Sequence, residues 1–172
     1  MPATYTLIAS NTLGSDTASI TFSSIPGTYT DLVLRCSVRG TRVSNTVDIF
    51  YAEFNGDTAT NYSNTDLTGT GSAAASARAS SNTVARLGYI PASTSTADTF
   101  SNTEVYIPSY TVAQNKPNSN FGVQENNNAT AYIEVNANLW RNTAAITSIK
   151  LLPGNASFKS GSSFFLYGIK NS

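Results

Sequence analysis

Apolar residues recur at every second position along much of this chain. Between Asp31 and Arg39, one set of alternate positions holds Leu32, Leu34, Cys36 and Val38. The segment from Ala129 to Leu139 repeats the pattern, with Ala129, Ala131, Ile133, Val135, Ala137 and Leu139 opposing Thr130, Tyr132, Glu134, Asn136 and Asn138. Successive side chains of a β-strand point to opposite faces, whereas a helix would scatter the apolar set around its circumference. Both segments are therefore predicted to be strands that bury their apolar face and turn Ser, Thr and Asn outward.

Shorter runs with the same period are separated by turn residues. The sequences Ile25-Pro26-Gly27, Asn55-Gly56-Asp57 and Pro153-Gly154-Asn155 combine residues that favour tight turns. Further strands are expected at Tyr5–Ile8, Ile20–Phe22, Val47–Phe54, Val84–Ile90, Thr103–Ile107, Ala145–Leu152 and Phe164–Ile169. The pattern predicts an all-β fold: one antiparallel, jelly-roll-like β-sandwich domain over residues 1–172, with about eight to ten strands.

Two segments interrupt this rhythm. Residues 68–82, TGTGSAAASARASSN, hold one charge and no large apolar side chain. Such a segment buries too little surface to offset the entropy of ordering it, so a mobile loop is expected there. Residues 110–128 are expected to form a second long loop around a short strand at Phe121–Gln124.

The composition excludes several functional classes. Ten basic residues balance ten acidic ones, so the charge that drives nucleic-acid binding is missing. The chain has no histidine and one cysteine, which removes histidine-dependent nucleophiles, histidine metal ligands and internal disulfides. No apolar stretch approaches the roughly 18 residues of a membrane span. The start, MPATYTLIAS, does not resemble a secretion signal, and we expect synthesis in a cytoplasm.

Acidic residues offer few catalytic candidates. Asp48 with Glu53, or Glu104 with Glu134, are the pairs that a glycosidase would need. Each lies on the polar face of an expected strand, which favours solvated side chains over catalysis. We therefore expect no enzymatic activity and no cofactor.

A calcium site is one reading of the acids and amides at positions 57–66. Hard cations bind Asp and Asn oxygens, but no known calcium-loop spacing matches this segment. A turn whose side chains satisfy its own backbone is the favoured interpretation of Asp57, Asn61, Asn64 and Asp66.

Aromatic and basic side chains are the candidates for an interface. Tyr29, Tyr62 and Tyr110 lie in expected loops, where exposed rings stack on sugars or anchor a protein partner. Trp140 closes the strand that starts at Ala129, and packing at the rim of the core is its favoured role. One interpretation of the arginines near the strand at 31–39 is a local basic stripe. The favoured alternative is that they are solvated charges that discourage edge-to-edge aggregation. The residues selected for an interface are Arg39, Arg42, Tyr62, Arg78 and Trp140.

Several stretches resemble small virion proteins of tailed bacteriophages, especially marine and cyanobacterial phages. The resemblance is carried by TYTLIAS, ITFSSIPGTYTDLVLR (20–35), TFSNTEVYIPSY (99–110), LWRNTAAITSIKLLP (139–153) and the ending FFLYGIKNS. It implies a single-domain jelly-roll or related β-sandwich on the virion exterior, and it supplies no catalytic residues.

Two roles on a virion follow from these expectations. The first is a capsid decoration, or cement, protein: a homo-oligomer, expected to be a trimer, that binds the major capsid protein and bridges neighbouring capsomers. The alternative is a tail appendage that binds a host-surface glycan through Trp140, Tyr62 and Tyr110. In both, the protein lies on the exterior of the phage particle after synthesis in the host cytoplasm.

Overall fold

The computed structural model describes residues 4–128 and 130–170, and within these ranges every regular element is a β-strand. The prediction of an all-β fold is therefore confirmed. The strands are β1 (Tyr5–Thr12), β2 (Ile20–Phe22), β3 (Asp31–Ser37), β4 (Val47–Phe54), β5 (Tyr62–Gly69), β6 (Ala74–Asn82), β7 (Ala85–Pro91), β8 (Asn102–Ile107), β9 (Lys116–Gln124), β10 (Tyr132–Trp140), β11 (Ile149–Pro153) and β12 (Ser163–Ile169).

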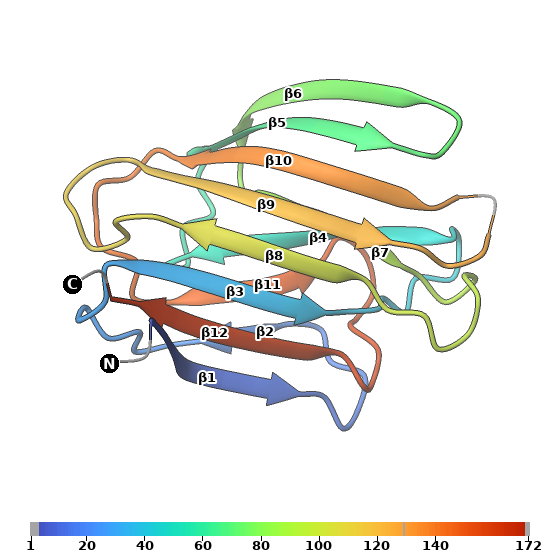
Figure 1. Ribbon diagram of the computed structural model, residues 1–172, viewed down its shortest axis with the longest axis horizontal. Helices are drawn as coiled ribbons and strands as arrows, with labels where there is room; N and C mark the ends of the chain where they lie inside the picture. Colours follow the sequence, from blue (N-terminus) through green and yellow to red (C-terminus); the bar gives the residue numbers. More distant parts are fainter. Residues whose placement is uncertain (1–3, 129, 171–172) are drawn as a thin grey trace.

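The strands form two antiparallel sheets that pack face to face (Figure 1). The larger has eight strands in the order β1-β12-β3-β8-β9-β10-β5-β6, and the smaller has four in the order β2-β11-β4-β7. Within this arrangement, β1-β12-β3-β8 and β2-β11-β4-β7 have the strand order of a jelly roll. The other four strands are two inserted hairpins, β5–β6 and β9–β10, which widen the larger sheet (Figure 1).

The core lies between the two sheets and follows the alternation of the sequence. In β3, Leu32, Leu34 and Cys36 are buried against the smaller sheet's residues. Phe158 packs edge-to-face on Phe164, with ring centres 5.0 Å apart. Burial raises the pKa of the free Cys36 thiol well above its usual value, so this side chain acts as a small apolar group.

The segment expected to be a mobile loop at 68–82 is a strand hairpin. Strand β5 continues to Gly69, residues 70–73 form the turn, and β6 runs from Ala74 to Asn82 alongside β5. Backbone pairing supplies the order that side-chain burial does not, because most β6 side chains are exposed.

The expected long loop at 110–128 likewise contains a full strand. β9 begins at Lys116, well before the short strand expected at Phe121–Gln124, and pairs with β8 and β10. The strand expected from Ala129 begins at Tyr132, and Ala129 itself lies outside the described residues.

Candidate functional site

Strands β9 and β10 carry polar side chains inward and apolar side chains outward. In β10, Glu134, Asn136 and Asn138 are buried, whereas Ile133 and Val135 are 50% and 47% exposed. In β9, buried Asn118 and Asn120 alternate with exposed positions in the same way. The expectation that β10 buries its apolar face is therefore wrong.

Two of the inward asparagines, Asn120 and Asn138, bond to β7, the edge strand of the smaller sheet. The Asn120 amide donates to the Leu87 carbonyl over 2.8 Å, and the Asn138 amide donates to the Arg86 carbonyl over 3.0 Å. An edge strand has backbone groups that lack a neighbouring strand, and side-chain amides supply the missing partners here. These bonds give a physical reason for the inverted orientation of β9 and β10.

A buried ion pair fixes the same contact. The Arg86 Nε lies 2.7 Å from Glu134 Oε1, and the Asn136 amide donates to the same oxygen over 3.0 Å. Burial alone would lower the pKa of Arg86, but the hydrogen bond and charge of Glu134 raise it. Each charge of this buried pair has a counter-charge, which makes its burial tolerable. The ion pair and the asparagine bonds together join β10 to β7.

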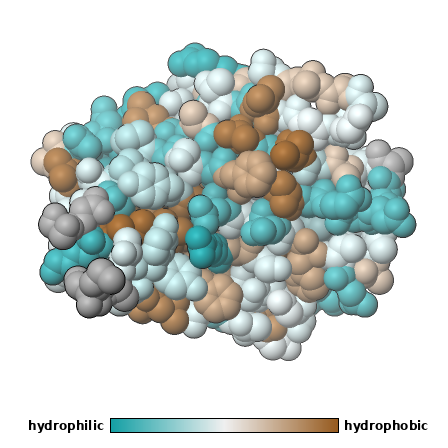
Figure 2. Space-filling view, in the orientation of Figure 1, coloured by the Kyte–Doolittle hydropathy of each residue, from teal (hydrophilic) through white to brown (hydrophobic). Residues whose placement is uncertain are grey.

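The inversion leaves an apolar area on the outer face of the larger sheet. We call it the outer patch, and it consists of Leu67 (β5), Tyr106 (β8), Phe121 (β9), Ile133 and Val135 (β10). Val135 lies directly opposite Leu67 on one neighbouring strand and Phe121 on the other. Figure 2 looks onto this face and shows hydrophobic side chains gathered over β5, β10 and β9. Contiguous apolar side chains of this kind mark interaction surfaces.

Polar and aromatic groups border the outer patch. Glu104, opposite Phe121 in register, forms a half-exposed ion pair with Arg35 at 2.7 Å. The Arg35 guanidinium lies 5.6 Å from the centre of the Tyr5 ring and 6.0 Å from that of Tyr167. The hydrogen bond to Glu104 raises the pKa of Arg35. An apolar centre with a polar rim is the usual anatomy of a protein interface.

Two shallow hollows indent the outer patch. One has a volume of 200 Å³ beside Leu67, Ile133 and Val135. The other has a volume of 170 Å³ beside Tyr106, Phe121 and Val135. Each hollow is large enough to accept a single side chain of a partner.

The aromatic residues selected from the sequence belong to the core. Tyr62 and Trp140 are buried and stack with ring centres 6.3 Å apart. The Tyr62 hydroxyl donates to the Asp57 carbonyl and the Trp140 Nε1 donates to Asp57 Oδ2, over 2.9 and 2.8 Å. Burial raises the pKa of Tyr62 to about 12. Tyr110 is also buried, so the expected exposed platform of Tyr62, Tyr110 and Trp140 does not exist.

The selected arginines have different surroundings. Arg39 is buried and its guanidinium donates to the carbonyls of Thr96 and Thr99 over 2.8 and 2.9 Å, so it holds a loop in place. Arg42 lies between β3 and β4, 3.8 Å from an Asp48 oxygen. Arg78 is exposed, opposite Thr65 on the outward side of β6. Of the arginines selected, Arg78 lies nearest in register to the outer patch.

The acids selected from the sequence do not form catalytic pairs. Glu104 points outward and Glu134 inward, on opposite faces of one sheet. Asp48 and Glu53 are buried rather than solvated as expected: Asp48 accepts bonds from Asn155, and Glu53 pairs with Lys150 at 3.1 Å.

The Asp57 turn satisfies its own groups. Asp57 accepts bonds from the Ala59 amide and the Asn61 side chain, both at 2.9 Å. Within the part of the chain that the structure describes, no three His, Cys, Asp or Glu residues cluster as metal ligands. The same residues include no helix with the length and apolar character to cross a membrane.

The outer patch had a signal in the sequence that composition alone did not reveal. Asn118 and Asn120 alternate with Phe121 and Val123 on the opposite parity, and Glu134, Asn136 and Asn138 alternate likewise in β10. Two polar stripes on adjacent strands are a pattern expected of side chains that bond to each other; the Asn138 amide indeed donates to Asn120 Oδ1 over 2.9 Å.

Comparison with known proteins adds no family to this description. No model of a known protein family matches the chain. A search of curated proteins also finds no significant match. The resemblance to phage virion proteins therefore stays a prediction.

Proposed function

We propose that this protein is a structural protein of a tailed-phage virion, and that it decorates the outside of the capsid by docking through the outer patch. The observation that carries the proposal is the inverted hairpin β9–β10, which buries amides and a carboxylate while it exposes Phe121, Ile133 and Val135. The occupant of the outer patch in this proposal is the major capsid protein, at the boundary between neighbouring capsomers.

Energetics favour a covered outer patch. Its side chains are 39–56% exposed, and burying the exposed half of a large apolar side chain contributes about 1 kcal/mol. Several such residues in register supply the centre of an interface, and the Arg35–Glu104 pair supplies part of its rim. Many weak contacts on one lattice also reinforce one another.

The rest of the surface suits crowded copies. The chain contains 23 serines, 23 threonines and 18 asparagines, and only 12% of its residues are charged. Neutral hydroxyl and amide groups keep a surface hydrated without repulsion between neighbouring copies. The proposal includes a homo-oligomer, a trimer, as the unit that docks.

Rebinding to particles tests the proposal. Phe121→Thr removes the central aromatic ring of the outer patch and keeps a residue that favours strands. We expect it to weaken binding to particles produced without the protein by about tenfold, measured by co-sedimentation. The control is Val43→Thr, which removes an even more exposed apolar side chain outside the patch and should leave binding unchanged.

Sedimentation of the isolated protein distinguishes an outer patch that binds the capsid protein from one that joins copies of this chain. If Phe121→Thr dissociates a free oligomer, or if particle binding is unaffected, the assignment of the outer patch to the capsid protein is wrong. A tail appendage is distinguished by copy number, since mass spectrometry of particles would then find few copies rather than enough to cover the shell.

A further inference from the structure

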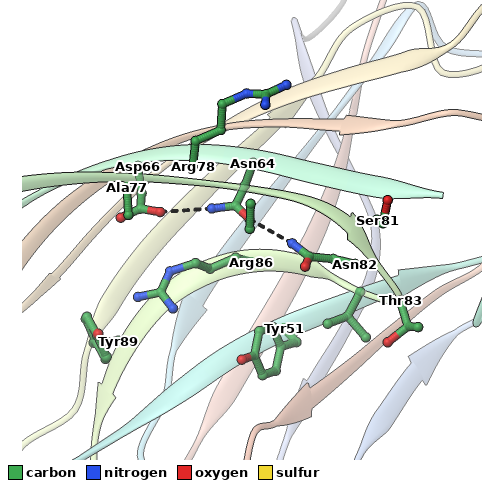
Figure 3. Close-up of a pocket in the computed structure, with 12 residues that line it drawn as sticks. Tyr51, Asn64, Asp66, Ala77, Arg78, Ser81, Asn82, Thr83, Arg86 and Tyr89 are labelled. Atoms are coloured by element: carbon green, nitrogen blue, oxygen red, sulfur yellow. Dashed lines mark hydrogen bonds between the residues drawn. The ribbon is translucent and has the colours of Figure 1, made fainter. Parts of the chain in front are cut away.

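A polar groove of 530 Å³ lies on the inner side of the β5–β6 hairpin, away from the outer patch (Figure 3). Strands β5 and β6 form one wall, and Tyr51 of β4 with Arg86 and Tyr89 of β7 form the other. The groove exists because the inserted hairpin extends the larger sheet past β7, the edge of the smaller sheet. Its volume is in the range of sites for small organic ligands.

The hairpin wall carries a chain of ordered polar side chains. The Asn64 amide donates to Asp66 Oδ1 over 2.9 Å, and the Asn82 amide donates to Asn64 Oδ1 over 3.0 Å (Figure 3). Among the described residues, no hydrogen-bond donor reaches Asp66 Oδ2 or Asn82 Oδ1. The wall therefore presents two oriented acceptors to the groove.

The opposite wall presents rings and donors that are already held in place. Arg86 lies 4.6 Å from the centre of the Tyr89 ring, and Tyr89 stacks on Tyr132 with ring centres 4.2 Å apart. Tyr51 points into the groove from β4 (Figure 3). Burial raises the pKa of Tyr51, so its hydroxyl stays protonated as a hydrogen-bond donor. Rigid rings beside polar groups lose little entropy on binding.

Irregular backbone borders the groove on both sides. In β7 the pairing with β4 shifts at Phe50 and Tyr51, with Leu87 as the extra residue, and Gly88 has φ of 121°. In β6 the pairing with β5 shifts between Tyr62 and Asn64, and Ser81 has φ of 61°. Bulges re-aim side chains, and a serine with positive φ is an uncommon conformation that concentrates at functional sites.

The charge of the groove selects a neutral ligand. Arg86 is balanced by Glu134, and Arg78 points away from the groove (Figure 3). Asp66 is then an unbalanced negative charge that repels phosphate, sulfate and carboxylate groups. Amides, a carboxylate and a guanidinium together supply donors and acceptors, which is what a molecule with many hydroxyl groups requires.

We propose that this groove binds a neutral saccharide, whose hydroxyl groups bond to Asp66, Asn82 and Arg86 and whose C–H face packs on Tyr51. Aromatic rings beside fixed polar groups recognise this mixture of apolar faces and hydroxyls. The inference goes beyond the proposed decoration function. It holds whether or not the outer patch docks on a capsid, because the groove opens on the other side of the sheet.

Nuclear magnetic resonance titration tests the saccharide site. The probes are hexasaccharides of glucose, mannose, galactose and N-acetylglucosamine, with inorganic phosphate as the anionic probe. We expect at least one hexasaccharide to shift the signals of Asn64, Asn82 and Arg86 with a Kd of about 1 mM or tighter, and phosphate to shift none.

Two leucine substitutions on β6 separate the groove from the rest of the hairpin. Ala77 faces the groove opposite Asp66, so Ala77→Leu should fill it and weaken binding by about tenfold or more. The control, Ser76→Leu, places the same side chain on the outward side opposite Leu67 and should bind normally. Failure of all four hexasaccharides, shifts outside the groove, equal binding by both variants, or binding of phosphate instead would each overturn the proposal.

Discussion

At the scale of single residues, the contact between β10 and β7 buries one of two chemically identical Arg–Glu pairs. Glu134 is buried and its partner Arg86 is mostly so, whereas the chemically identical pair Glu104–Arg35 is half exposed. In water a charged pair contributes little, while an unpaired buried charge is costly. The two glutamates therefore make a matched test of the buried polar layer.

Glu134→Gln should destabilise the fold far more than Glu104→Gln. The first leaves the Arg86 charge buried without a counter-charge, and we expect it to lower the free energy of unfolding by about 3 kcal/mol. The second removes an exposed pair, with an expected loss below about 1 kcal/mol. Urea unfolding followed by Trp140 fluorescence measures both. Equal losses would show that the inward face of β10 is solvated.

Asp57 makes part of the stability dependent on acid. Hydrogen bonds from Asn61 and Trp140 lower the pKa of Asp57 below its usual value. Because the folded-state pKa is the lower one, this stability is fully present above the unfolded value of about 4 and is lost as pH falls through the folded value. Asp57→Asn should flatten this dependence in urea unfolding between about pH 5 and about pH 3. If the variant still loses stability as steeply as the natural protein, Asp57 is not the source of this acid dependence.

Residue identities alone did not reveal which polar side chains are buried. Glu134, Asn136 and Asn138 are residue types that are usually exposed, and their burial depends on carbonyls that β7 brings from far along the chain. The sequence favours packing at the core as the role of Trp140, and its burial agrees with that expectation. The burial of Trp140 does not agree with its selection as an interface residue.

At the scale of elements, alternation predicted the strands of the jelly roll and the inserted strand β10, but it missed most of the other inserted strands. β4 at Val47–Phe54 coincides with the expected strand, and β3, β7 and β8 differ by one or two residues. β5, β6 and the first part of β9 were missed because they alternate small and polar residues without a strong apolar set. Their order comes from backbone pairing with neighbours, which no local pattern shows.

The edge strand β6 should be less protected from hydrogen exchange than the interior strand β10. It pairs with β5 alone and most of its side chains are exposed, whereas β10 has partners on both sides. We expect β6 amides to exchange with deuterium faster than β10 amides by about a hundredfold or more. Similar protection in both strands, measured on the isolated protein, would indicate that β6 is covered by another copy.

At the scale of the whole molecule, the inserted hairpins add two separate surfaces to a jelly roll. Outward, β9, β10 and β5 expose the outer patch, and inward, β5 and β6 overhang the polar groove. The jelly-roll sheets themselves contain the core that holds both surfaces in place. One sheet can thus contact a partner with one face and a small ligand with the other.

The proposal that the protein decorates a phage capsid is tested most directly by locating it on phage particles. In a cryo-electron-microscopy reconstruction of the phage, we predict density for this sandwich on the outer shell between capsomers, with Leu67, Phe121 and Val135 turned toward the capsid protein. Density at the tail alone, or on the shell with the outer patch facing solvent, would contradict it.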